Sequence, residues 1–182
     1  MTIVPRPRAA IHTPAPPTAG RRWPSRIYPG LLAQAAWVRE DLRSDLSRLE
    51  GLCPDLADTI VLCASEMFAN AADHSRSGQA NGRVVRTLSM PTATALHLGI
   101  TDDGVRAESP SLPHIPHQRT ASDWEQAERG RGLLLVNSLS TRWGARAVVD
   151  FPFCAGLGTV VWAEFTLTPA APASATAAGA DR

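Results

Sequence analysis

The segment Ser65-Glu66-Met67-Phe68-Ala69-Asn70-Ala71-Ala72-Asp73-His74 lies in a run whose apolar residues recur every three or four positions. This spacing predicts an amphipathic helix over residues 55–73. Its buried stripe is expected to contain Ile60, Cys63, Met67, Ala71 and His74. Glu66 and Asn70 are four residues apart, so they share one helix face at the edge of that stripe. Asn70 could supply an oxygen ligand to Mg²⁺, and Glu66 could orient or deprotonate a nucleophile. The alternative is an ordinary solvated Glu/Asn pair.

The sequence around this helix predicts two more helices and several strands. One helix is expected over residues 31–49 and another from about 130 to 144. The first should bury Leu31, Ala35, Val38, Leu42 and Leu46. A short strand is expected at 22–28, and further strands at 145–151 and 159–167. Alternating apolar residues predict a strand hairpin with its turn at 91–93. One face of its strands carries Val84, Arg86, Leu88, Met90, Leu96, Leu98 and Ile100. This order of elements predicts an α+β fold, a two-layer α/β sandwich with a mostly antiparallel sheet.

Composition limits the classes of function. All 18 basic residues are arginine, which excludes the P-loop and protein-kinase nucleotide sites, because both require a lysine. The net charge of +1 gives no electrostatic argument for binding nucleic acid. No apolar run approaches the roughly 20 residues of a membrane span. Cys53, Cys63 and Cys154 are expected to be unpaired buried thiols.

Three further motifs suggest a ligand site. Asp102-Asp103-Gly104 ends an apolar strand, where Asp102 could accept a hydrogen bond from an adenine amino group and Gly104 would allow close approach; an ordinary turn is the alternative. The segment Arg129-Gly130-Arg131-Gly132 precedes an apolar helix, whose open amides could bind an anion, although a flexible start to a helix would look the same. Thr159, which follows Gly158, could reach a base directly or through water, or could be a plain strand residue.

The order and spacing of these motifs resemble the N, G1 and G2 boxes and the final threonine of the GHKL (Bergerat-fold, histidine-kinase-like) ATPases. Within that superfamily, the chain looks most like the anti-sigma-factor serine kinases and related single-domain ATP-binding regulators of actinobacteria. Ser65-Glu66, Asn70-Ala71 and His74-Ser75 carry this resemblance, together with Gly130-Arg131-Gly132-Leu133 and Arg142-Trp143-Gly144. The resemblance covers nearly the whole of a domain predicted over residues 22–168. The composition on either side predicts a disordered Pro/Arg-rich tail at 1–21 and a disordered Ala-rich tail at 169–182.

The resemblance also implies a role for each site residue. Asn70 would hold Mg²⁺ and Glu66 would be the general base, while Asp102, Gly104 and Thr159 would receive adenine. Residues 105–129 would form a lid over ATP. The phosphates would bind at Arg129, Gly130, Arg131 and Gly132.

Two positions depart from the family pattern. Arg106 stands where the G1 box usually has a second glycine, which leaves the start of the lid uncertain. Asp73 stands where histidine kinases usually carry Lys or Arg, which disfavours a histidine kinase. Its charge could help to hold Mg²⁺ or could repel phosphate.

The function implied is a cytoplasmic serine/threonine protein kinase that phosphorylates an anti-sigma antagonist protein and binds a sigma factor. It would contact neither nucleic acid nor membrane directly, and relatives commonly form homodimers. A non-catalytic, nucleotide-dependent protein-binding module is the alternative. A free-standing ATPase is a third interpretation. Phosphate transfer to a serine-bearing partner separates the kinase from the binding module.

Overall fold

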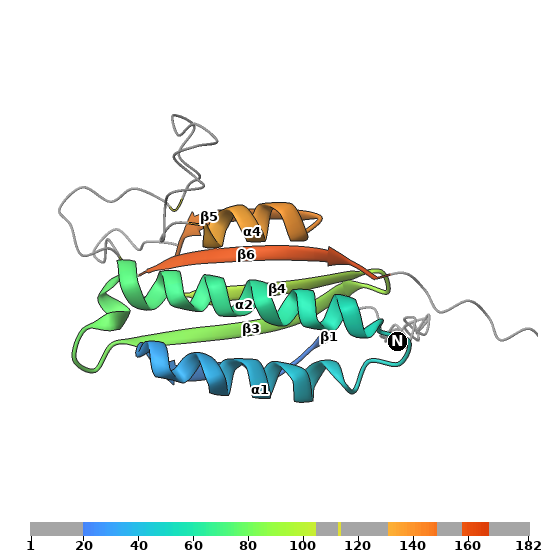
Figure 1. Ribbon diagram of the computed structural model, residues 1–182, viewed down its shortest axis with the longest axis horizontal. Coiled ribbons are helices and arrows are strands. Elements are labelled where there is room, and N and C mark those ends of the chain that lie inside the picture. The colour runs from blue at the N-terminus through green and yellow to red at the C-terminus, as the bar shows by residue number, and fades with distance from the viewer. Residues whose placement is uncertain (1–19, 105–112, 114–130, 149–157, 168–182) are drawn as a thin grey trace, which may run out of the picture.

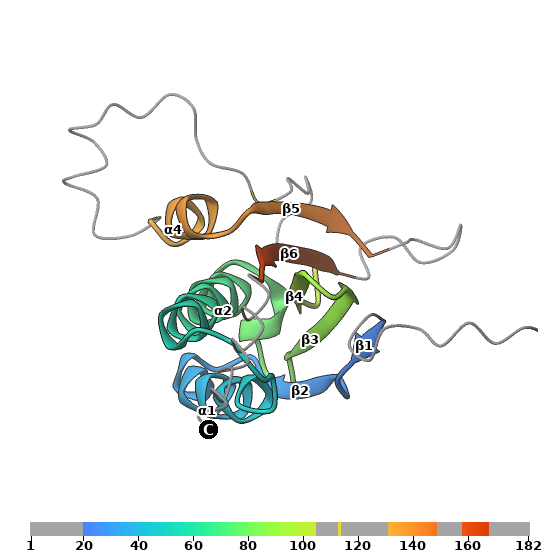
Figure 2. The ribbon, with the colours of Figure 1, turned by 90° about the vertical axis from the view of Figure 1, so that its right-hand side faces the viewer.

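A layer of helices covers one face of an antiparallel sheet in the computed structural model, which describes residues 20–104, 113, 131–148 and 158–167 (Figures 1 and 2). The helices are α1 (Ala35–Leu46), α2 (Pro54–His74) and α4 (Gly132–Leu139), with 3₁₀ turns η1 (Leu32–Gln34) and η2 (Arg76–Gly78). The strands are β1 (Arg21–Arg22), β2 (Arg26–Pro29), β3 (Arg83–Thr92), β4 (Ala95–Thr101), β5 (Arg142–Ala147) and β6 (Thr159–Thr166). The predicted two-layer α+β sandwich is therefore confirmed.

The sheet order is β1-β3-β4-β6-β5, and β2 pairs with β3 alongside β1. All these pairings are antiparallel, and Leu88, Leu98 and Ala163 lie in one row across the three central strands. Because side chains alternate along a strand, this register sends one set toward the helices. The predicted apolar faces of β3 and β4 are buried, as expected.

The helices bury most of the residues that the periodicity indicates. In α2 the predicted stripe is buried except at its end, where His74 is exposed. In α1 Val38, Leu42 and Leu46 are buried, but Leu31 is 55% exposed. The prediction that Leu31 belongs to the helix was wrong. Its backbone is extended, and the 3₁₀ turn η1 begins at the next residue. Pro54 begins α2, a position where the ring has the required φ and no amide hydrogen bond is lost.

Several predicted boundaries were wrong. The strand expected at 22–28 is two strands, separated at Trp23–Ser25, and the 83–101 hairpin turns at Ala93–Thr94. The last helix ends at Leu139 rather than near Trp143, which belongs to β5. The Ser140 amide and hydroxyl both donate to the Val136 carbonyl, and the next amide donates to Glu164 in β6. The backbone thus changes to sheet pairing three residues earlier than the sequence indicates.

A buried ion pair joins α1 to the sheet. Arg86 lies on the inward face of β3 with 0% exposure, and its Nη2 donates to the Asp45 carboxylate of α1. Arg26 approaches Asp45 at 3.6 Å and Asp41 at 3.3 Å, and the Tyr28 hydroxyl donates to Asp41 at 2.9 Å. The Nε and Nη1 atoms of Arg86 are buried, and no described residue is a hydrogen-bond partner for them. The guanidinium therefore depends on Asp45 for compensation of its charge.

Replacing Asp45 with Ala is expected to lower the free energy of unfolding by about 3–5 kcal/mol, because Arg86 would remain buried without a counter-charge. Urea denaturation measures this loss. The control is Asp58→Ala, since that carboxylate is exposed and 3.9 Å from Arg43. Such a surface pair contributes about 1 kcal/mol or less. Equal effects of the two substitutions would contradict the assignment.

Candidate functional site

Helix α2 holds Glu66 and Asn70 one turn apart, beside its buried stripe. Met67 and Ala71 next to them are buried, whereas Glu66 and Asn70 are only partly buried. The apolar neighbours fix the rotation of α2 against the core, so the two polar side chains must lie at the rim of the helix layer. Sequence periodicity predicted this placement.

The first residue of α4 lies directly against these two side chains. A Cβ added to Gly132 would lie 2.7 Å from Glu66 Oε2 and 3.3 Å from Asn70 Nδ2. The shorter distance is below ordinary van der Waals contact, so only glycine allows this approach without a shift of Glu66. The structure thus brings together three of the predicted site residues from two separate helices.

This rim has the features of an anion site. Arg131 is the N-cap of α4, and its side chain makes no capping hydrogen bond to the first amides of the helix. Uncapped amides at a helix N-terminus favour anionic ligands such as phosphate. The Nδ2 atom of Asn70 is buried, and no partner for it occurs in the described part of the chain. The residues present therefore fit a phosphate held between α2 and α4, with the Asn70 amide beside it.

A second group of predicted residues meets at the ends of β4 and β6. One carboxylate oxygen of Asp102, Oδ1, accepts from the Gly104 amide at 2.7 Å and from the Thr159 amide at 2.9 Å. The Asp102 amide donates to the Thr159 carbonyl at 3.0 Å. No described residue donates to the other oxygen, Oδ2. Asp102 is thus held by one oxygen and can offer the second to a ligand.

Burial raises the pKa of Asp102 above its ordinary value of 3.8, although the Gly104 and Thr159 amides act in the opposite direction. Desolvation disfavours the charged carboxylate, while hydrogen bonds to the carboxylate favour it. Asp102 therefore takes up a proton at a higher pH than an exposed aspartate.

The sequence interpretation named Gly158 but gave it no role. Its φ is +144°, and a Cβ there would lie 2.1 Å from the Asp102 carbonyl oxygen. Any other residue would force Asp102 and Thr159 apart. Its position directly before Thr159 was the only signal in the sequence. Gly104, with φ of +85°, is also confined to a conformation that favours glycine.

Comparison with known proteins identifies the family. A family model described as a histidine kinase-like ATPase domain matches residues 28–162, from β2 to β6. The chain belongs to this family. No curated protein matches it. Among solved structures, the chain is similar to the crystal structure of the RsbU and RsbW domains of a Mycobacterium tuberculosis protein, with 18% identity and a TM-score of 0.48. That match covers 79% of this chain and 32% of the solved chain, so this chain spans about a third of the solved one.

Of the other residues that the sequence singled out in this histidine kinase-like ATPase domain, some are exposed on the helices and some lie outside the described residues. Arg131 is exposed at the start of α4, and Asp73 is exposed on α2, one turn beyond Asn70. Arg129, Gly130 and Arg106 lie outside the described residues, as does the 105–129 lid apart from Pro113. No helix in the described segments combines the length and apolar character needed to cross a bilayer.

The cysteines of the domain are not part of the chemistry assigned to the site. Cys63 is buried one turn before Glu66, Cys53 is exposed, and Cys154 lies outside the described residues. Burial, with a smaller contribution from the Glu66 charge, raises the pKa of Cys63 to about 11. Its thiol therefore stays protonated and weakly nucleophilic at neutral pH. The expectation of a buried thiol was right for Cys63 and wrong for Cys53.

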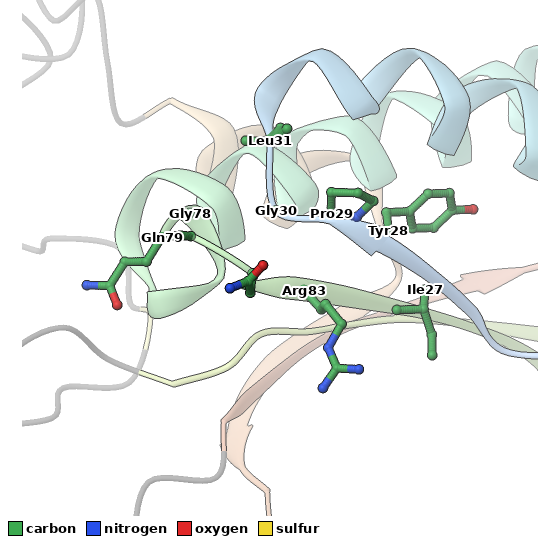
Figure 3. A pocket seen from close by; sticks show the side chains of 11 residues that line it. Ile27, Tyr28, Pro29, Gly30, Leu31, Gly78, Gln79 and Arg83 are labelled. Carbon is green, nitrogen blue, oxygen red and sulfur yellow. The ribbon is translucent and has the colours of Figure 1, made fainter.

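A separate groove of about 700 Å³ lies between β2 and the segment that joins η2 to β3 (Figure 3). Ile27, Pro29 and Arg83 are among the side chains along it. None of the predicted site residues lines this groove. The groove is therefore separate from the residues that the sequence predicts for a nucleotide site.

Replacing Gly132 with Ala tests the close approach of the two helices. Alanine is a better helix former than glycine, by about 1 kcal/mol, so the folded state should lose little stability. The added Cβ, which would also lie only 3.3 Å from Asn70 Nδ2, should push the start of α4 away from Asn70 and reduce nucleotide binding at least tenfold. Calorimetric titration measures binding, with the exposed α4 substitution Ser138→Ala as control. Unchanged affinity in Gly132→Ala would refute a site at this contact.

Proposed function

We propose that this domain binds Mg-ATP at the rim formed by α2, the start of α4 and the ends of β4 and β6. We further propose that it transfers the γ-phosphoryl group to a serine or threonine of an antagonist protein. The contact of Gly132 with Glu66 and Asn70 is the observation that supports this best. It joins a carboxylate, an amide and an open helix N-terminus, which phosphoryl transfer uses for proton acceptance, metal binding and charge stabilisation.

In this proposal each group has one task. Asn70 would contribute its side-chain oxygen to Mg²⁺, which prefers oxygen ligands and is commonly shared with substrate phosphates. The first amides of α4 would face the phosphates, with Arg131 and, by resemblance, Arg129 and Gly130 beside them. Glu66 would accept the proton of the attacking hydroxyl. The bond from the γ-phosphorus to the β–γ bridging oxygen would break as the bond to the hydroxyl oxygen forms, and ADP would leave.

The base would bind at the other group of residues. Asp102 Oδ2 would accept from the adenine amino group, and Gly104 and Thr159 would border the ring. The hydrogen bonds of Oδ1 to the Gly104 and Thr159 amides support this role, since they fix the carboxylate before a ligand arrives. Such preorganisation lowers the cost of binding.

The partners follow from the sequence resemblance alone. The protein would bind a sigma factor and keep it inactive, and it would phosphorylate a serine-bearing antagonist protein. The protein would act in the cytoplasm, without direct contact to nucleic acid or membrane, and as a possible homodimer.

A non-catalytic nucleotide-dependent binding module is the second candidate. Asp73 favours it, because this exposed carboxylate lies one turn beyond Asn70 and adds negative charge near the phosphate site. Arg106, in place of the usual G1 glycine, favours it as well. In such a protein ATP would set the shape of the domain and no phosphate would be transferred.

Substitutions of Asn70 and Glu66 test the proposal. Asn70→Ala should weaken Mg-ATP binding at least tenfold and remove its magnesium dependence. Glu66→Ala should leave binding within about threefold while lowering transfer by about 100-fold or more, the range of general-base catalysis. Calorimetry measures binding, and radiolabelled γ-phosphate measures transfer to candidate antagonists.

The control for both is Asp58→Ala, an exposed carboxylate on the same helix. Tight nucleotide binding with no transfer to any antagonist would establish the binding module instead. No nucleotide binding by the folded protein would refute both.

The raised pKa of Asp102 makes a prediction about pH. Base recognition requires the ionised carboxylate, so affinity should fall as the pH decreases through this raised pKa. In Asp102→Asn, the side-chain oxygen would accept from the Gly104 and Thr159 amides. The side-chain NH₂ group would then face the adenine amino group, and these two donors cannot form a hydrogen bond. The ratio of wild-type to Asp102→Asn affinity should therefore be large at pH values well above the Asp102 pKa and should decrease as the pH is lowered through it. The ratio cancels titration of the ATP phosphates, whose pKa is about 6. A constant ratio would contradict the role of Asp102.

A further inference from the structure

The two groups of the proposed site belong to different elements, and a network of hydrogen bonds joins those elements. Asn70 lies on α2, whereas Asp102 follows β4. The network contains Ser75, Arg76, Ser77, Arg83 and Asp103, and we term it the Ser77 junction. The sequence interpretation treated Ser77-Gly78 only as the end of a helix.

The junction begins at the residue after Asn70. The Ser75 hydroxyl donates to the Ala71 carbonyl at 2.6 Å and accepts from the Ser77 amide at 3.0 Å. Ser75 is itself buried. Two hydrogen bonds thus connect the start of η2 to the last turn of α2, and they hold Ser77 close to the end of that helix.

Ser77 then connects η2 to β3 and to the segment that follows β4. Its side-chain oxygen donates to the Arg83 carbonyl at 2.6 Å and accepts from the Asp103 amide at 2.9 Å. The Arg83 amide in turn donates to Asp103 Oδ2 at 2.6 Å. Ser77 has 0% exposure, so water cannot replace these bonds readily. Asp103 is the direct neighbour of Asp102.

Arg76 holds the same loop from the other side. Its Nε donates to the Asp103 carbonyl at 2.9 Å, and its amide donates to the Gly104 carbonyl at 2.8 Å. The Gly104 amide donates to Asp102 Oδ1. The bonds therefore run without a break from the end of α2 to the carboxylate proposed to bind the base.

Two glycines confine the backbone of the junction. A Cβ on Gly30 would lie 1.9 Å from the Ser77 carbonyl oxygen, and one on Gly82 would lie 2.2 Å from it. Both glycines also line the groove of Figure 3. Their backbones pack directly against the Ser77 carbonyl, which restrains the Ser77 backbone.

We propose that Ser77 is a positioning residue that sets the location of Asp102 relative to Asn70, and with it the preference of the site for adenine. This inference rests on the proposed ATP site. Without the Ser77 hydroxyl, the Asp103 amide and the Arg83 carbonyl both lose a partner in part-buried hydrogen bonds. The loop that carries Asp102 and Gly104 then shifts or loosens, while Asn70 stays on its helix.

The test compares Ser77→Ala with Ser140→Ala, which removes a part-buried hydroxyl bonded at 2.6 Å to the last turn of α4. Calorimetry with Mg-ATP and Mg-GTP gives the ratio of the two affinities. Ser77→Ala should weaken Mg-ATP binding roughly tenfold, the effect of about one hydrogen bond. It should also reduce the ATP-to-GTP ratio, while Ser140→Ala changes neither. If Ser77→Ala lowers only the melting temperature and leaves the ratio unchanged, the positioning role is refuted.

A second pair of variants decides the matter if Ser77→Ala does not fold. Asp103→Asn keeps an oxygen that can accept from the Arg83 amide, whereas Asp103→Ala does not. We expect Asp103→Asn to keep the wild-type ATP-to-GTP ratio and Asp103→Ala to lose it. Equal loss in both variants would mean that the Asp103 charge matters and not the bonded geometry, and would overturn the proposal.

Amide hydrogen exchange of the nucleotide-free protein separates this inference from the proposed function. The Gly104 and Thr159 amides both donate to Asp102 Oδ1, so their exchange reports whether the carboxylate is held in place. Both should exchange at least tenfold faster in Ser77→Ala than in wild type or Ser140→Ala. If wild type binds no ATP, the proposed function fails, yet faster exchange still supports positioning by Ser77. Unchanged exchange refutes positioning whatever the nucleotide result.

Discussion

The close contact between Gly132 and the polar edge of α2 is the constraint on which the proposed site depends. A side chain at this position would meet Glu66 Oε2 at 2.7 Å, so glycine lets the start of α4 come this close without moving the Glu66 carboxylate. Val136, one turn further along α4, is fully buried and anchors the helix to the core. Burial of Val136 and the absence of a Cβ at Gly132 together direct the open N-terminus of α4 toward Glu66 and Asn70.

Strand register imposes the second half of the site in the same way. Thr101 of β4 pairs with Val160 of β6, so the residues that follow and precede them, Asp102 and Thr159, must lie opposite each other. The Asp102 amide donates to the Thr159 carbonyl, and the Thr159 amide donates to the Asp102 carboxylate. The proposed base-binding group is thus a consequence of sheet geometry, whereas the proposed phosphate-binding group is a consequence of helix packing. The proposed site lies where the two layers end together.

Local patterns in the sequence predicted what local physics determines. The 3.6-residue period placed Glu66 and Asn70 at the rim of α2, and strand alternation gave the buried faces of β3 and β4. The same alternation placed Arg86 on an apolar face but could not explain why an arginine is there. Its partner Asp45 is 41 residues away in the chain and belongs to another element. The end of α4 was missed for a similar reason: Ser140 and Thr141 take their partners from the final turn and from β6. The Ser77 junction depends on contacts among η2, β3 and the 102–104 loop, which no single segment encodes.

Buried polar groups in the described part of this domain are satisfied unevenly. Around Ser77, buried donors and acceptors bond to one another, whereas Asn70 Nδ2 is buried with no partner among the described residues. An unsatisfied buried group costs about 1–3 kcal/mol, which a ligand can recover. Trp23 Nε1 and Ser65 Oγ are also buried without a described partner, so this property alone marks no site. Asn70 differs from Trp23 and Ser65 because the Glu66 carboxylate and the N-terminus of α4 lie beside it, which is the combination that the proposed Mg-ATP site requires.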